Sequence, residues 1–440
     1  MTTYDHLGFI TNYSNIQNSI FVPRYYNPEI PHRLEELKAT HKLVTIAELV
    51  DAKKLSIKAG REVGKMAYGT GTIPFVRTSD LSNWELITDT KQGVSDAIYR
   101  LHSAKQDVRE GDILLVKDGT YLIGQTCMIT KYDLPLLYQS HVLKLRVLDD
   151  DLIDNYLLLA LLNAPVVKKQ IRSIQFTADI IDTIGNRLQE VVLPVPREEA
   201  ARNDISEGVK NAIETRTKYR ERIRGLPKEI APTSDDDFEE QRGNTGFLIQ
   251  YSKLKNGIFI PRYYDPVLEE NLKKLRDSHH LVSLEALVKN KVITWATGKE
   301  IGKMAYGTGK IPFVRTSDII NWELKTDPKQ GVSEEIYATN KQDVQAGDIL
   351  LVRVGTNCIV TKHDEKMLFC GGLYKLRVID RSKLDPYLLL ALLNTPIVKR
   401  QIRSKQFTRD IIDTIGKRLF EVLLPIPKSP DRRAEISGSA

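Results

Sequence analysis

The sequence has few of the residues that mark disulfide-rich, metal-binding or membrane proteins. Its three cysteines, Cys127, Cys358 and Cys370, form no CxxC pair and have no histidines at metal-ligand spacing. We therefore expect no disulfide framework, no zinc module and a reducing compartment. The most apolar run, residues 156–167, is too short to span a bilayer, and residues 1–15 lack a basic start followed by an apolar stretch. These absences predict a cytoplasmic protein without a membrane segment.

The excess of positively over negatively charged residues is also small. The chain has 64 Lys and Arg against 57 Asp and Glu, a net charge of +7. This balance permits a polyanionic partner without requiring one. Hydrophobic residues at 41% and charged residues at 28% are typical of a globular protein, which excludes a collagen-like or wholly disordered chain.

Two halves of the chain repeat one another. GKMAYGTG occurs at 64–71 and again at 302–309, and IPFVRTSD follows each copy, so that Arg77 matches Arg315 at an offset of 238 residues. The offset falls to 236 at KQDV and to 231 at KLRV. We place these deletions of the second copy in surface loops. Each copy has about 190 residues, which is enough to bury a core of its own.

The duplication predicts a chain of mixed α/β (α+β) class with two homologous domains. Between them, Ile205, Val209 and Ile213 recur at helical spacing, and Gly225 with Pro227 predicts where that helix ends. The predicted parts are domain 1 at 1–196, a long amphipathic spacer helix at 197–226, an acidic linker at 227–244, domain 2 at 245–428, and the truncated start of a second spacer helix at 429–440.

Helices and strands alternate within each copy. Residues 32–50 have apolar positions at helical spacing and predict one helix. The apolar runs 111–116 and 141–149 predict strands. Residues 156–175 predict a helix that is broken near Pro165.

Catalytic motifs are missing. An amino-methyltransferase needs an Asn/Asp-Pro-Pro-aromatic tetrapeptide, which residues 163–166 (NAPV) do not provide, and a Gly-rich turn after a strand, whereas Gly69-Thr70-Gly71 precedes one. The sequence has no P-loop lysine and no GxSxG. The acidic pair Asp265 and Glu270 is not repeated, because Asn27 replaces the aspartate in the first copy. We therefore expect no catalytic residue, no metal site and no bound cofactor.

The most polar segment that the copies share is a Gly-rich turn leading into a strand. Its basic, hydroxyl and aromatic side chains suit contacts to DNA phosphates and base edges. A structural loop with a solvated surface is the alternative interpretation. The candidate DNA-binding residues are Arg61, Lys65, Tyr68, Arg77, Thr78 and Ser79 in the first copy, and Lys299, Lys303, Tyr306, Arg315, Thr316 and Ser317 in the second.

A second candidate surface is a constant strand, GDILLV, that leads into a divergent loop. In this way one fold could recognise two different DNA sequences. The alternative interpretation is that the exposed turn has changed in sequence without a functional reason. A further divergent stretch is 56–59 against 294–297. The candidate DNA-binding residues of the loop are Lys117, Thr120 and Tyr121 in the first copy and Arg353, Thr356 and Asn357 in the second, with Tyr121 aligned on Asn357 before a five-residue gap.

The ordered set of motifs resembles the target recognition domains of type I restriction-modification specificity subunits. The order is PRYY, the Gly-rich loop into IPFVRTSD, GDILLV, KLRV, the YLLLALLN helix, QFTADIIDTIGNRL and a strand ending LPVP before a long helix. The resemblance implies a non-catalytic subunit of a phage-defence system. Each domain would read one half of a bipartite double-stranded DNA target through the major groove, and the spacer helix would dock methyltransferase (modification) subunits.

The same resemblance implies that AdoMet, Mg²⁺ and ATP belong to partner subunits, with a restriction subunit supplying ATP-dependent cleavage. A different class of function also fits the modest net charge: an interaction or inhibitor protein of a phage-defence complex that retains the scaffold without reading DNA. The salt dependence of DNA affinity separates the two, because phosphate neutralisation makes binding fall steeply with salt.

Overall fold

The computed structural model describes residues 12–16, 20–88, 90, 92–119, 121–178, 181–232, 247–255, 257–326, 328, 330–353, 355–409 and 412–439. The chain divides into two compact units, unit 1 (Met1–Thr217) and unit 2 (Lys218–Ala440), and each is described by itself. Within the described ranges, no helix combines the length and the apolar character needed to cross a bilayer.

Unit 1 is built on a four-stranded antiparallel sheet in the order β2-β10-β7-β8. The other strands in the described part of unit 1 form a three-stranded sheet in the order β6-β3-β9 and three two-stranded pairs. The bounds are β1 (His41–Thr45) paired with β13 (Val192–Pro196), β2 (Leu55–Ala59), β10 (Val142–Val147), β7 (Ile113–Val116), β8 (Thr126–Met128), β6 (Gly93–Val94), β3 (Ile73–Val76), β9 (Leu137–Tyr138), β4 (Leu81–Ser82) paired with β5 (Glu85–Leu86), and β11 (Phe176–Ala178) paired with β12 (Ile181–Thr183).

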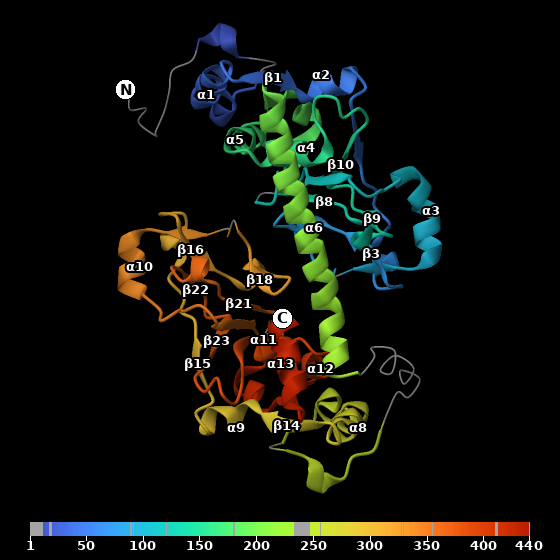
Figure 1. Ribbon diagram of the computed structural model, residues 1–440, viewed down its shortest axis with the longest axis vertical. Helices are drawn as coiled ribbons and strands as arrows, with labels where there is room; N and C mark the ends of the chain where they lie inside the picture. The colour runs from blue at the N-terminus through green and yellow to red at the C-terminus, as the bar shows by residue number, and fades with distance from the viewer. Residues whose placement is uncertain are drawn as a thin grey trace. The chain divides into compact units, whose positions relative to one another are not determined.

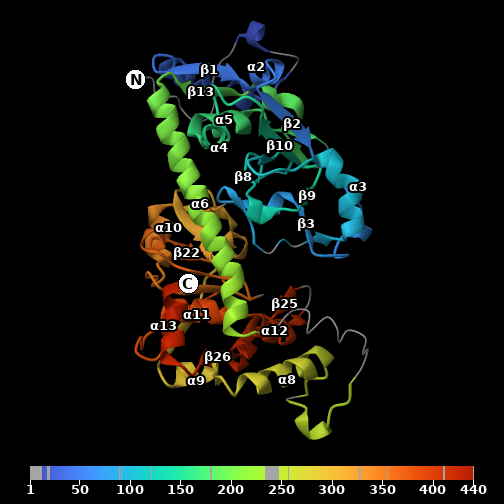
Figure 2. The ribbon, with the colours of Figure 1, turned by 45° about the vertical axis from the view of Figure 1, so that its right-hand side comes forward.

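Helices flank both sheets of unit 1. In Figures 1 and 2, α3 lies beside β3 and β9, and α4 lies behind the first part of the long helix α6. The predicted break near Pro165 is confirmed, because α4 ends and α5 begins there with proline at its first position. The helices are α1 (Glu29–Leu37), α2 (Ile46–Asp51), α3 (Asp96–Gln106), α4 (Asn155–Asn163), α5 (Pro165–Ser173) and α6 (Glu199–Ile230), with 3₁₀ turns η1 (Tyr13–Asn15), η2 (Pro23–Tyr26), η3 (Lys65–Ala67), η4 (Thr78–Asp80), η5 (Lys131–Asp133) and η6 (Gly185–Glu190).

Strand β7 separates two cores of unit 1. Successive side chains of a strand point to opposite faces. Ile113 and Leu115 therefore join the core that contains α4 and α5, whereas Leu114 and Val116 join the core beneath the smaller sheet. All four are buried, which explains why the run ILLV is continuously apolar.

Unit 2 repeats the same elements, and the predicted mixed α/β class is confirmed. Its sheets have the orders β15-β23-β20-β21, β19-β16-β22, β14-β26, β17-β18 and β24-β25. Its strands are β14 (His279–Ser283), β15 (Ile293–Thr297), β16 (Ile311–Val314), β17 (Ile319–Ile320), β18 (Glu323–Leu324), β19 (Gly331–Val332), β20 (Ile349–Val352), β21 (Asn357–Ile359), β22 (Leu368–Phe369), β23 (Leu373–Val378), β24 (Phe407–Arg409), β25 (Ile412–Thr414) and β26 (Leu423–Pro427). Its helices are α8 (Pro266–Leu275), α9 (Leu284–Lys289), α10 (Glu334–Asn340), α11 (Pro386–Leu393), α12 (Pro396–Ser404) and α13 (Pro430–Ser439), with 3₁₀ turns η8 (Tyr251–Lys253), η9 (Pro261–Tyr264), η10 (Lys303–Ala305), η11 (Thr316–Asp318), η12 (Lys362–Asp364) and η13 (Gly416–Glu421).

The single helix predicted over 32–50 is wrong. Strand β1 lies between α1 and α2, because residues 41–45 pair with β13 across the unit. Thr45 then begins α2 through a capping box: Glu48 N donates to Thr45 Oγ1 at 3.1 Å, and Thr45 N donates to Glu48 Oε2 at 2.7 Å. A strand partner 150 residues away outweighed the local periodicity.

The long helix α6 begins at Glu199 and continues past the predicted stop at 226. Pro227 lies inside it, and the first four residues of the predicted linker are helical. Leu226 and Ile230 are buried in the core of unit 2, so tertiary packing overrides the turn residues. Residues 233–244 of the predicted linker lie outside the described residues. Helix α13, at the predicted second spacer helix, lies beside α11 in both views of unit 2 (Figures 1 and 2).

Candidate nucleic-acid interface

One end of the four-stranded sheet brings the two predicted DNA-binding segments together in each unit. In unit 1, β2 ends and β10 begins with Ala59 opposite Leu143, and β7 ends with Val116 opposite Val142. The Gly-rich segment therefore leaves the sheet at the same edge as the divergent loop. The equivalent strands β15, β20 and β23 make the same arrangement in unit 2.

Both segments are tied to the short stretch 138–141 that enters β10. Arg61 N donates to Tyr138 O at 3.2 Å, and Lys117 N donates to His141 O at 3.0 Å. Glycine is needed at position 60, where a Cβ would lie 2.2 Å from the carbonyl oxygen of residue 139. In unit 2, a Cβ on Gly298 would lie 2.1 Å from a carbonyl oxygen at the equivalent place.

The Gly-rich segment presents its lysines to solvent and anchors its tyrosine. Arg61 and Lys65 are exposed, as are their counterparts Lys299 and Lys303. Each tyrosine is half-buried and packs on a core phenylalanine, with ring centroids 5.5 Å apart for Tyr68 and 5.4 Å apart for Tyr306. The predicted basic contacts are thus available to a ligand, whereas the tyrosines are partly structural.

The RTSD motif forms a 3₁₀ turn that a buried aspartate caps. Arg77 N donates to Asp80 Oδ2 at 2.8 Å, and Asp80 is 1% exposed. Arg77 and Thr78 are half-buried, and Ser79 is exposed. Nε of Arg77 is buried and has no hydrogen-bond partner among the described residues.

The same turn is more open in unit 2. Arg315, Thr316 and Ser317 are all exposed there. The Arg315 guanidinium lies 5.9 Å from the centroid of the Tyr306 ring, and Arg315 N donates to Asp318 Oδ2 at 2.8 Å. The backbone of the turn is therefore the same in both units, while the arginine side chain is more exposed in unit 2.

The divergent loop of unit 1 centres on Asp118, which the sequence reasoning missed. Asp118 Oδ2 lies 2.8 Å from His141 Nδ1 and 3.6 Å from Lys117 Nζ, and Thr183 Oγ1 donates to Asp118 Oδ1 at 2.5 Å. Tyr121 is 59% exposed, and Thr120 lies outside the described residues. The side chains that the network holds combine donors and acceptors, which suits contact with base edges.

Unit 2 has different chemistry at this place. Arg353 and Val354, of which Val354 lies outside the described residues, replace residues 117–123, and Gly372 replaces His141. Arg353 replaces the lysine, donates to Gly371 O at 2.7 Å and lies 5.8 Å from an aromatic ring centroid. Thr356 is exposed.

Asn357 is a structural residue, and the prediction that it contacts DNA is wrong. It is 1% exposed, its Nδ2 donates to Gly355 O at 3.0 Å, and Asn394 Nδ2 donates to its Oδ1 at 2.6 Å. Buried carboxamides require such internal partners.

The register of the second deletion also differs from the prediction. In unit 1 the equivalent hydrogen bond joins Asn163 Nδ2 to Thr126 Oγ1 at 2.8 Å, so Asn357 corresponds to Thr126. Gly355 corresponds to Gly124 as well, because Gly355 N donates to Val352 O as Gly124 N donates to Val116 O. The five residues that unit 2 lacks therefore lie among 117–123, the part of the loop that includes Tyr121. Asn163 and Asn394 already align in the repeated helix. The buried strand residue that each of them contacts therefore marks the position of the gap.

A network of charged side chains lies at the opposite end of each four-stranded sheet. The sequence analysis did not identify it. Arg146 Nε and Nη2 contact both oxygens of Asp112 at 2.6 and 2.7 Å, and its Nη1 contacts Asp107 Oδ2 at 2.7 Å. The hydrogen bond from Arg146 is the main cause that lowers the pKa of Asp107 to about 2. Lys144, 2% exposed, donates to the carbonyl oxygen of residue 106 at 2.7 Å.

Unit 2 repeats the contacts of this arginine with two aspartates. Arg377 contacts Asp348 through Nε and Nη2 at 2.6 and 2.7 Å, and Asp343 through Nη1 at 2.6 Å. The repeated motifs KQDV, GDILLV and KLRV therefore supply the charged residues of one network that fixes the strands of the sheet.

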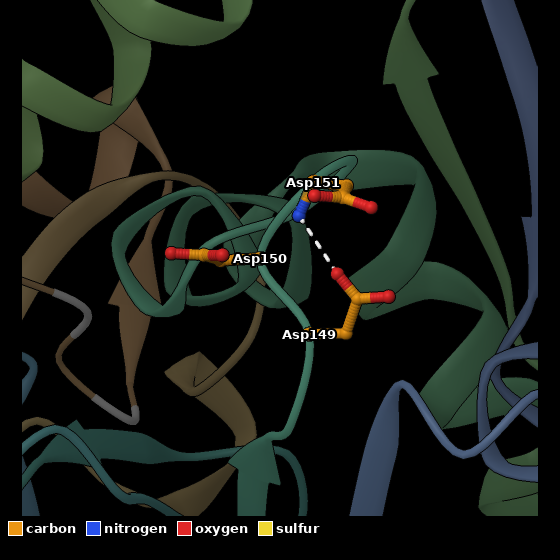
Figure 3. Close-up of side chains that lie close together, drawn as sticks. All are labelled: Asp149, Asp150 and Asp151. Atoms are coloured by element: carbon orange, nitrogen blue, oxygen red, sulfur yellow. Dashed lines mark hydrogen bonds between the residues drawn. The ribbon is translucent and has the colours of Figure 1, made fainter.

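One cluster of acidic residues in the described part of the chain could hold a metal ion. The carboxylates of Asp149–Asp151 lie within 4.8 Å of one another on the turn after β10 (Figure 3). Asp151 N donates to Asp149 Oδ1 at 3.1 Å, and Lys54 Nζ lies 2.9 Å from Asp149 Oδ2, which lowers the pKa of that carboxyl. In unit 2, Arg381 takes the middle position. An exposed, lysine-paired cluster that the second unit lacks gives no reason to assign a metal.

No family model and no curated protein matches the chain. The solved structures that are similar to it include the following three. A type I restriction-modification S subunit from M. genitalium is 14% identical, with 90% of this chain and 87% of that chain covered and a TM-score of 0.34. The HsdS subunit from Thermoanaerobacter tengcongensis is 15% identical, with 90% and 87% covered and a TM-score of 0.28. A structure described as the basis of complex assembly and conformational transition of the type I R-M system is 14% identical, with 91% and 88% covered and a TM-score of 0.28.

Proposed function

We propose that this chain is the non-catalytic DNA sequence-recognition subunit of a type I-like restriction-modification complex, in which each unit reads one half of a bipartite double-stranded target. The observation that carries the proposal is the pairing of a common and a divergent segment at the same sheet end in both units. Exposed lysines that recur in both units suit phosphates, which every DNA sequence presents. Loops that differ suit base edges, which differ between half-targets.

The two divergent loops offer different groups to DNA. Lys117, Asp118 and His141 provide a cation, a carboxylate and an imidazole in unit 1, whereas Arg353 provides a guanidinium in unit 2. A guanidinium suits the paired acceptors of guanine, and a carboxylate suits the amino group of cytosine. The two half-targets should therefore differ in sequence.

Helix α6 is the proposed docking element for methyltransferase subunits. Ile205 is 38% exposed and Tyr219 is 64% exposed along it, and aromatic residues are enriched in protein interfaces. AdoMet, Mg²⁺ and ATP would be bound by the modification and restriction subunits of the complex.

The arginines of the two RTSD turns test the proposal. We expect Arg77→Ala and Arg315→Ala each to weaken binding to one half-target by about 1–3 kcal/mol if the side chain contacts a base. Titrations of the chain with its methyltransferase subunits against duplexes altered in one half would measure the loss. An equal loss on random DNA would indicate a phosphate contact. Affinity that neither variant changes and that stays flat with salt would contradict DNA recognition and favour the protein-interaction function.

A further inference from the structure

Each unit holds one methionine almost fully in solvent at the tip of its Gly-rich segment. Met66 in η3 and Met304 in η10 are each 93% exposed. The two residues occupy the same position of the repeat, and a lysine precedes each of them. A single exposed apolar residue is unremarkable, but the same one held out in both units needs a cause.

The tip is held in place on the side away from the methionine. In unit 1, Ala67 is buried, Thr70 Oγ1 donates to Ala67 O at 2.7 Å, and Ser95 N donates to Thr70 Oγ1 at 3.0 Å. Gly69 N donates to the carbonyl oxygen of residue 93 at 2.8 Å. Gly64, with φ of +80°, lets the chain enter the turn.

Unit 2 builds the same frame. Thr308 Oγ1 donates to Ala305 O at 2.8 Å, Ser333 N donates to Thr308 Oγ1 at 3.1 Å, and Gly307 N donates to the carbonyl oxygen of residue 331 at 2.8 Å. The exposure of both methionines is therefore a product of a fixed turn and not of a loose loop.

The surroundings of the methionines favour DNA over protein as the group that they contact. Lys65 and Lys303 are exposed beside them, and the basic residues Arg61 and Lys299 are exposed at the start of the segment. Lysine is depleted in protein interfaces but neutralises phosphates. A methionine could contact DNA in two ways. If it packed on the methyl group of thymine, the same base would be required in both half-targets. If it inserted between base pairs as an apolar wedge, any sequence would be tolerated, which suits a residue that the two units share.

We propose that Met66 and Met304 are wedges that insert between stacked base pairs, one in each half-target, while Lys65 and Lys303 hold the neighbouring phosphates. This inference rests on the proposed function and adds a distortion of the DNA to it. The wedge side chain must be apolar and long, so leucine should replace methionine and alanine should not.

The experiment uses the full chain with its methyltransferase subunits and a duplex recovered by selection from random DNA. 2-Aminopurine is placed at successive positions of each half to report unstacking. We expect a fluorescence rise at one step of each half, which Met66→Ala abolishes in the first half and Met304→Ala in the second. Affinity should fall about tenfold for the double alanine variant and remain near wild type for Met66→Leu with Met304→Leu.

Lys65→Ala with Lys303→Ala is the matched control. It should lower the slope of log affinity against log salt by about one per lysine, whereas the methionine variants should leave that slope unchanged. Alanine variants that keep both the fluorescence rise and the affinity would overturn the wedge alone. Alanine variants that bind DNA normally but no longer bind the methyltransferase would also overturn it, since the tip would then be a protein contact. A wild-type complex that binds no duplex would overturn the proposed function together with the wedge.

Discussion

Units 1 and 2 share their frame and differ at one end of their main sheet. Arg146 and Arg377 make the same bidentate contact to a buried aspartate in the two units. At the sheet end, Asp118 binds an imidazole in unit 1, while Arg353 binds a backbone carbonyl in unit 2. The duplication therefore separates residues that the scaffold needs, which recur, from residues free to change with the half-target.

The largest expected effect comes from disrupting the ion network that both units share. Asp112→Ala removes the buried carboxylate that both Lys144, 2% exposed, and the half-buried Arg146 contact, which should destabilise unit 1 by about 3–5 kcal/mol. Asp348→Ala should do the same to unit 2, because its network is the same. Denaturant unfolding followed by probes in each unit measures both changes.

A surface pair provides the control for this prediction. Arg100 lies 2.7 Å from Asp96, and both side chains are exposed, so Asp96→Ala should have little effect. A loss as small for Asp112→Ala as for Asp96→Ala would contradict a structural function of the network.

The next largest effect concerns DNA binding by the two divergent loops. Arg353→Ala should weaken binding to the second half-target by about 1–3 kcal/mol, and Lys117→Ala should act on the first half alone. Competition between duplexes mutated in one half at a time measures each loss. If both variants weakened binding to both halves equally, the divergent loops would contact phosphates and not bases.

The smallest expected effect concerns acid stability. In unit 1, Arg146 and then Arg109 lower the pKa of Asp107 to about 2; in unit 2, Gln345 takes the place of Arg109 beside Asp343. Because the folded pKa lies below the unfolded value of 3.8, the contribution of Asp107 is complete above that value and is lost as pH falls toward 2. Arg109→Gln should therefore shift the loss in unit 1 to higher pH, by an effect of less than about 1 kcal/mol.

Acid titration of the far-UV circular dichroism compares wild type with Arg109→Gln. Gln345→Arg is the reverse change and should protect unit 2 to lower pH. Coincident acid transitions for all three proteins would show that the second arginine contributes nothing.

The sequence alone predicted several of the repeated elements of the fold. The strands at 73–76, 113–116 and 142–147 and the helix break near Pro165 follow from local apolar patterns and turn residues. The errors lie where distant contacts decide. Strand β1 depends on β13, and the end of α6 depends on burial of Leu226 in a core that no local pattern reveals.

The candidate site was predicted less completely, for a related reason. Exposed lysines on a Gly-rich turn can be inferred from composition, but Asn357 and Thr126 look polar and are buried, because a helix asparagine pairs with each. Asp118 was passed over, since its importance comes from His141 and Thr183, which are distant in sequence. Polar residues can be assigned to solvent or to the interior only when their partners are known.

Selection of bound duplexes from randomised DNA, with the wild-type chain and with the Asp118→Val, His141→Gly variant, examines most directly whether the two units recognise unlike half-targets. The substitutions remove a carboxylate and an imidazole for which unit 2 has no equivalent in residues 353–356 and 372. We predict two dissimilar motifs at a fixed separation for wild type, with only the first motif changed in the variant. A single motif, two identical motifs, or a variant that alters both halves would contradict the account.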